Sequence, residues 1–221
     1  MTTVELWQRL LPLAFGAALS PMLLLGQLAL LTALGSRAVA LRRSVSFLLG
    51  TVIVVLVWTL AGGWIAHELP LHRHGADPVA AAVQLMLALA LLALALQTLR
   101  RPLPAAALER PVCTGLLAPL FQGAGLMAVN VTSLVLFLPA AQDVGRSGLP
   151  WDDRLGAWIG LGLITLLPIW LPPLLVLLSG PKGARLLERM GHWVAGHRRA
   201  IDVAVAAGFA LLLAVRGLGE L

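Results

Sequence analysis

The sequence predicts an all-α integral membrane protein with six transmembrane helices. Three observations lead to this prediction: the composition, the length of the apolar stretches and the placement of the charges. Hydrophobic residues make up 59% of the 221 residues and charged residues 12%, and the mean hydropathy is +0.92. Soluble domains usually contain about a quarter charged residues, and a short chain cannot bury this much apolar surface in its own core. Lipid is therefore expected to cover most of the surface.

Six apolar stretches are long enough to cross a bilayer, which takes about 20 residues in a helix. They lie at roughly 8–34, 44–66, 78–99, 114–140, 155–179 and 200–218. None shows the strict alternation of polar and apolar residues that barrel strands have, so helices are expected. The first stretch is too long for the core of a signal peptide and follows the acidic Glu5, so we expect no cleaved signal.

The basic residues predict how the helices are oriented. Of the 16 Lys and Arg, eleven lie in 35–43, 100–110 and 180–199, which share one side of the predicted membrane, and five lie on the other side. Cytoplasmic loops carry an excess of Lys and Arg. The larger set is therefore predicted to face the cytoplasm, with both termini outside the cytoplasmic (inner) membrane. The net charge of +6 follows from this asymmetry, and no nucleic-acid partner is expected.

The segment 181–199 is too polar to span the membrane. Its apolar residues recur at helical spacing between basic ones, as in Leu186, Met190 and Trp193. This pattern is typical of an amphipathic helix on the cytoplasmic surface. Alternatively, the segment is a basic loop that only orients the last span.

Three spans, a basic linker and three further spans indicate a duplication. The predicted units are a first three-helix repeat at 1–100, a cytoplasmic linker at 101–113 and a second repeat at 114–221, which includes the interfacial helix. An odd number of spans gives the two halves opposite orientations, which is the inverted repeat of many transporters. Spans one and four also share a feature, because Gly16 precedes Ser20-Pro21 at the same offset at which Gly125 precedes Val129-Asn130.

Polar and helix-breaking residues in the middle of the spans predict a substrate path. In span one, Gly16, Ser20 and Gln27 fall on one face of the helix, within about 40°. In span four, Gln122, Asn130 and Ser133 fall within about 80° of one another. Such faces line a path, or alternatively they serve ordinary helix packing. The predicted substrate-binding residues are Gly16, Ser20, Pro21, Gln27, Gln122, Asn130, Thr132, Ser133 and Pro168.

The prolines predict irregular helices. Pro21 removes a backbone donor and should kink or break span one. Polar backbone groups freed at membrane depth survive only inside protein or beside a wet cavity. Span five contains Pro168, Pro172 and Pro173, so it is either broken near its middle or bent near its cytoplasmic half. Gly156 and Gly160 form a GxxxG pattern, which suits close packing by another helix, including one in a homodimer.

In these features the chain resembles the GAP (glycopeptidolipid- and sulfolipid-addressing protein) family, which is part of the LysE superfamily of six-helix exporters. The stretches that carry the resemblance are LPLAFGAALSPMLLLGQLALL, SFLLGTVIVVL and the half from the fourth to the sixth span, which ends in the sequence from LLSGPKG onward. Ser20-Pro21 matches a Ser-Pro in the family's first helix. Asn130 matches the Asn of an Asn-Pro-Lys pattern in the fourth, where Val131 and Thr132 replace the Pro and Lys. The resemblance implies export across the cytoplasmic membrane, with lipid-linked substrates.

Four functions therefore remain open. The first is export of a lipid-linked or amphipathic metabolite, because the predicted path is polar but neutral. The others are export of amino acids or other small solutes, a non-transporting assembly factor for lipid export, and divalent-metal transport. The metal alternative is based on His67, His72 and His74, with Glu68 and Asp77, in an outer loop.

Neither an enzyme nor a cofactor is expected, because the sequence has no nucleophile–base pair, phosphate loop or intramembrane acid pair. The single Cys113 excludes an internal disulfide. The expected partners are membrane lipids and a lipid-like or small-molecule substrate.

Overall fold

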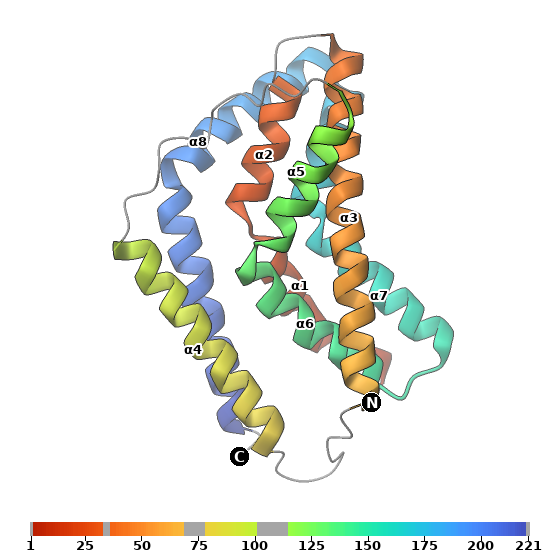
Figure 1. Ribbon diagram of the computed structural model, residues 1–221, viewed down its shortest axis with the longest axis vertical. Helices are drawn as coiled ribbons and strands as arrows, with labels where there is room; N and C mark the ends of the chain where they lie inside the picture. The colour runs from red at the N-terminus through yellow and green to blue at the C-terminus, as the bar shows by residue number, and fades with distance from the viewer. Residues whose placement is uncertain (1, 33–35, 69–77, 101–114, 220–221) are drawn as a thin grey trace.

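The computed structural model describes residues 2–32, 36–68, 78–100 and 115–219 (Figure 1). Within these ranges the regular structure is entirely α-helical, which confirms the all-α prediction. The helices are α1 Thr3–Ala18, α2 Pro21–Thr32, α3 Arg37–Glu68, α4 Pro78–Arg100, α5 Leu117–Ala128, α6 Val131–Arg146, α7 Trp151–Thr165 and α8 Leu167–Gly219. The predicted linker 101–113 lies outside the described residues.

Three of the predicted spans are interrupted helices. The bend is 55° between α1 and α2, 72° between α5 and α6, and 70° between α7 and the first part of α8. Pro21 is the first residue of α2, as its missing backbone donor favours. Span five is broken at Leu166, two residues before Pro168, whereas Pro172 and Pro173 lie within α8. Span five is therefore broken and not merely bent.

The described helices account for one to four membrane spans by length and composition. α3 qualifies alone over Arg37–Trp64, and each of the three bent pairs qualifies if it is counted as one span. The apolar part of α4, Gln84–Arg100, is shorter, and the predicted sixth span is the last part of α8. The count of six spans stays a prediction.

α8 contains one turn that redirects it. Gly180 has φ 55° and ψ −133°, a conformation that side chains with a Cβ rarely adopt. Beyond it the helix crosses one end of the molecule and then extends beside α4 (Figure 1). The segment 181–199 is helical, as predicted, and it continues into the predicted last span without a break.

The main helix contacts join the first half of the chain to the second. α1 packs against α6 and α7, α2 against α8, α3 against α5 and α6, and α4 against α8. The core that results includes Leu10, Leu13, Phe47, Phe137 and Leu161, none of which is exposed. The two halves are therefore interleaved.

Glycines allow the closest of these contacts. Gly50 of α3 faces the backbone of Leu120 in α5, and Gly123 of α5 faces the backbone of Phe47 in α3. A Cβ at either glycine would overlap the facing carbonyl oxygen. This reciprocal pair brings the two helices together at backbone distance, which is a common use of glycine between membrane helices.

Other glycines face side chains of the same chain. Gly160, in the predicted GxxxG pattern, faces the ring of Trp7 in α1, whereas a Cβ at Gly156 would meet nothing within 4 Å.

The outer surface is strongly apolar, with Leu60 and Leu178 each 74% exposed. Large exposed apolar patches are unusual on soluble monomers, and lipid would cover them.

Candidate functional site

The interruption in the first predicted span meets the interruption in the fourth. The Nδ2 of Asn130 donates a hydrogen bond to the Oγ of Ser20, at 2.8 Å. Ser20 follows the end of α1 and precedes α2, and Asn130 lies between α5 and α6. Ser20 is 9% exposed and Asn130 is half-buried. Two residues predicted from separate spans therefore lie in direct contact.

Asn130 has this position because it is the N-cap of α6. Its Oδ1 accepts a hydrogen bond from the backbone amide of Ser133 at 3.3 Å, an arrangement for which asparagine is among the preferred residues. The Oγ of Ser133 donates to the carbonyl of Ala17 in α1, at 2.7 Å. We call the group Ala17, Ser20, Asn130 and Ser133 the polar bridge.

The polar bridge lies where two half-helices begin. α2 starts directly after Ser20 and α6 directly after Asn130, and the N-terminal end of a helix carries a partial positive charge. The side chains of the bridge are neutral. Hydroxyl and amide groups beside two helix N-termini suit the oxygen atoms of a hydroxyl, sulfate or phosphate group better than a cation.

Gln27 forms a second polar cluster, in the middle of α2. It is fully buried, and its Nε2 donates to the Oγ of Ser44 at 2.6 Å and to the carbonyl of Ile169 at 2.8 Å. The three residues join α2, α3 and α8. The Oε1 of Gln27 has no hydrogen-bond partner among the described residues. Ser44 was not predicted, because one serine near the start of an apolar span carries no distinctive signal.

The other predicted residues are dispersed around these two clusters. Gly16 packs under the ring of Phe209 in α8, with no room for a Cβ. Gln122 is half-buried and its Oε1 lacks a partner among the described residues. Thr132 and Pro168 are also half-buried. Within the described part of the chain, no hydrogen bond joins Gln122 or Thr132 to the polar bridge.

Sequence reasoning missed a contact of Arg37. Its guanidinium donates to the carbonyl of Val176 and, at 2.9 Å, to the carbonyl of Leu177. These carbonyls end the first part of α8, just before Gly180, and a cation is favourable at the C-terminal end of a helix. The contact joins the start of α3 to the turn in α8. The sequence contains no signal for this contact, because its acceptors are backbone carbonyls.

The predicted metal ligands lie largely beyond the described structure. His72, His74 and Asp77 fall outside the described residues, and the side chains of His67 and Glu68 are not described. The described residues contain no group of His, Cys, Asp or Glu suited to a metal ion.

The helices and the outer surface are apolar, and the interrupted helices meet at neutral polar groups. These features define the class of the protein, which is a helical protein of the membrane type. The chain belongs to the family described as Sap, sulfolipid-1-addressing protein, whose model matches residues 10–219. This match confirms the resemblance to lipid-addressing proteins. Neither a curated protein nor a solved structure matches the chain.

Proposed function

We propose that this protein exports a lipid-linked or amphipathic metabolite across the cytoplasmic membrane. The observation that carries the proposal is the polar bridge, where two interrupted helices meet through Ser20 and Asn130 at 2.8 Å. Irregular backbone at membrane depth is tolerated where it is buried in protein or lines a water-filled cavity. The family is named for the addressing of a sulfolipid, which supports a lipid with a polar head as the cargo.

The chemistry of the bridge favours a head group over a bare cation. The predicted spans contain no Asp, Glu, Lys or Arg except Arg9, Asp202 and Arg216, which lie close to the ends of spans one and six. Ion-coupled transporters usually keep an ionisable group inside the membrane. Neutral donors and two helix N-termini instead favour sulfate, phosphate or hydroxyl oxygens.

Unpaired polar atoms support a path that water or a polar group enters. The Oε1 atoms of Gln27 and Gln122 and the Oγ1 of Thr165 are buried and have no hydrogen-bond partner among the described residues. A buried polar atom without a partner costs about 1–3 kcal/mol. Water or substrate that reaches these atoms would remove that penalty.

The pattern of helix contacts supports the inverted repeat on which such a path would depend. α3 packs against α5 and α6, and in the corresponding positions α7 and α8 pack against α1 and α2. α4 and α8, which hold the predicted third and sixth spans, pack against each other. Each half therefore makes the same type of contact with the other, as expected for repeats that enclose a path.

The arrangement of the ends is consistent with the predicted orientation. α1 begins and α8 ends at the lower end of Figure 1, where α6 and α7 are also joined. α2 ends and α3 begins at the opposite end, together with the part of α8 that crosses the molecule. The start of α3 and the crossing part of α8, which lie at that second end, carry the basic residues Arg37, Arg42, Arg43, Lys182, Arg185 and Arg189. An excess of basic residues is expected on the cytoplasmic side.

Transport by the purified protein tests the proposal. The full chain is reconstituted in liposomes, and movement of a fluorescent lipid with a sulfated head group is followed by quenching from outside. We expect movement faster than in protein-free liposomes, and its loss in Asn130→Leu. Gly125→Ala is the matched control, because a Cβ there meets nothing within 4 Å.

No lipid movement by folded protein would contradict the proposal and favour an assembly factor. Accumulation of a labelled amino acid without lipid movement would favour a small-solute exporter. Each sample is normalised to folded protein by size-exclusion chromatography, so that loss of fold is not counted as loss of transport.

A further inference from the structure

The part of α8 beyond Gly180 presents different chemistry on different sides. Successive residues of a helix are rotated by about 100°, so the segment 181–199 has an inner face, a face toward α2 and an outer face. Leu187 and Val194 form the inner face and are 1% and 7% exposed. They hold this segment against the rest of the molecule, where it crosses the end (Figure 1).

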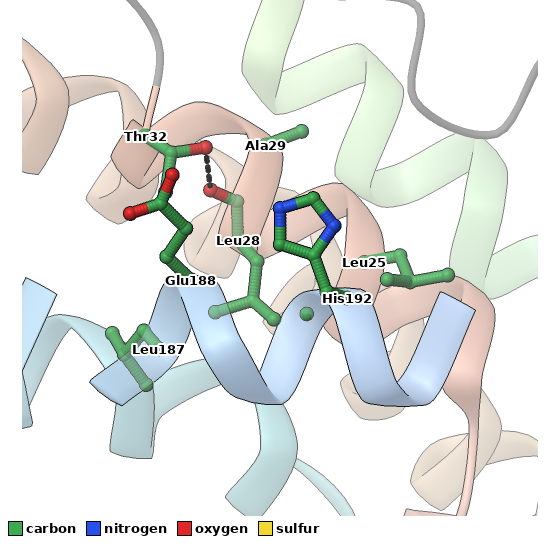
Figure 2. Close-up of a pocket in the computed structure, with 8 residues that line it drawn as sticks. Leu25, Leu28, Ala29, Thr32, Leu187, Glu188 and His192 are labelled. Carbon is green, nitrogen blue, oxygen red and sulfur yellow. Dashed lines mark hydrogen bonds between the residues drawn. The ribbon is translucent and has the colours of Figure 1, made fainter. Parts of the chain in front are cut away.

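The face toward α2 contains the segment's acidic residue. Glu188 is the one acid in 181–199, and with His192 it lines a cavity of about 250 Å³ between α8 and α2. Figure 2 shows both side chains directed into this space, with Glu188 beside Thr32. The negative charge of the segment is therefore turned away from its outer face.

The outer face carries three cations, Lys182, Arg185 and Arg189, which we call the basic row. All three side chains are exposed, and their positions fall within an arc of about 60°. None of them forms an ion pair with a described residue. The basic row therefore presents positive charge that the described protein does not neutralise.

The remaining arginines of the segment are occupied. Arg198 pairs with Asp202, with Nε and Oδ2 3.7 Å apart. Arg199 donates to the carbonyl of Leu99, at the end of α4. These two have structural partners, which separates them from the basic row.

An apolar flank lies directly beside the basic row. Leu186, Met190 and Trp193 are 51%, 41% and 60% exposed, and they fall within a neighbouring arc of about 60°. Adjacent basic and apolar faces are typical of helices at a membrane interface, where cations reach head groups and apolar side chains enter the acyl boundary.

We propose that the basic row and the apolar flank form a docking site for an anionic phospholipid. The phosphate lies against Lys182, Arg185 and Arg189, and the upper parts of the acyl chains lie along Leu186, Met190 and Trp193. Charge complementarity selects an anionic head group over a zwitterionic one. The apolar flank beside the cations favours a lipid over a soluble anion. This site is separate from the polar bridge and does not depend on transport.

Native mass spectrometry of the full chain in neutral detergent tests the site. Phosphatidylglycerol and phosphatidylcholine with identical acyl chains are titrated separately, and bound lipids are counted. We expect tighter binding of phosphatidylglycerol, and loss of this preference in the triple variant Lys182→Gln, Arg185→Gln, Arg189→Gln. Each cation near an anionic lipid contributes about a fivefold change in affinity, so single variants should show partial losses.

Arg42→Gln is the matched control, because Arg42 is also an exposed cation at the same end of the molecule and should leave the preference unchanged. Trp193→Ser should weaken binding of both lipids. Equal phosphatidylglycerol binding by the triple variant and the unmodified protein would overturn the proposal. Displacement of phosphatidylglycerol by an equal concentration of inorganic phosphate would also overturn it, because that result identifies a site for soluble anions.

Discussion

Asn130 and Ser20 are 110 residues apart in sequence, and their side chains form a hydrogen bond of 2.8 Å. The same Asn130 side chain caps α6 through its oxygen. The oxygen of the Asn130 amide therefore caps the start of α6. The nitrogen of the same amide joins this start to Ser20, at the interruption in the first span. Removing the side chain should disturb both.

Replacing Asn130 separates these two contributions. Asn130→Leu should abolish lipid movement in liposomes and lower stability by about 1–2 kcal/mol, because it removes the cap and the bond to Ser20. Asn130→Ser keeps a capping oxygen but is too short to reproduce the amide donor, so it should retain most stability and lose most transport. Transport per folded molecule that is unchanged in Asn130→Leu would assign the residue to packing alone.

The bond between Gln27 and Ser44 should be measurable as a coupling energy. A double-mutant cycle of Gln27→Leu and Ser44→Ala, followed by unfolding in detergent, should give about 0.6–1.7 kcal/mol, the range for polar contacts between membrane helices. Gln27→Leu alone should be more destabilising than Ser44→Ala, because it also leaves the carbonyl of Ile169 without its donor. Additive effects of the two changes would contradict the observed 2.6 Å contact.

The reciprocal glycine contact between α3 and α5 predicts that alanine is poorly tolerated. Gly50→Ala and Gly123→Ala should each lower stability by about 1–3 kcal/mol, because the added methyl group overlaps backbone atoms that cannot rotate away. Gly125→Ala, in the same helix as Gly123, should leave the thermal midpoint unchanged or raise it through higher helix propensity. Equal effects at Gly123 and Gly125 would show that the helices are not in close contact.

The predicted orientation can be tested by labelling single cysteines with a membrane-impermeant reagent in intact cells. In a Cys113→Ser background, Thr2→Cys and Arg73→Cys should react, and Arg42→Cys should react only after the membrane is permeabilised. The expected result follows from the excess of basic residues on the predicted cytoplasmic side. Reaction of Arg42→Cys alone in intact cells would reverse the orientation.

The sequence predicted the interruption of span one because Pro21 has a direct physical effect on the helix. It did not predict the interruption of span four, where the break lies at Val129 and Asn130 and no proline is present. The signal there is an N-cap residue followed three positions later by Ser133, within an apolar stretch. In span five the break falls at Leu166, so the prolines marked the region but not the residue.

Contacts between distant segments were less accessible from the sequence. Ser20 and Asn130 were both predicted for the path, and the structure brings them together. Nothing in the sequence distinguishes Ser44 as the partner of Gln27, or the carbonyls of Val176 and Leu177 as partners of Arg37. Backbone carbonyls have no residue type, and their availability depends on where a helix ends.

The interleaving of the two halves has a consequence for biosynthesis. α1, α2, α3 and α4 each have their main contacts with helices that are synthesised later. When the ribosome has completed α4, the glycine surface of α3 and the hydroxyl of Ser20 still lack their partners, and Gln27 has reached Ser44 but not the carbonyl of Ile169. The first half therefore has to wait, next to the insertion machinery or in the lipid, until α5 to α8 arrive, and α8 closes the fold by covering α2 and α4 last.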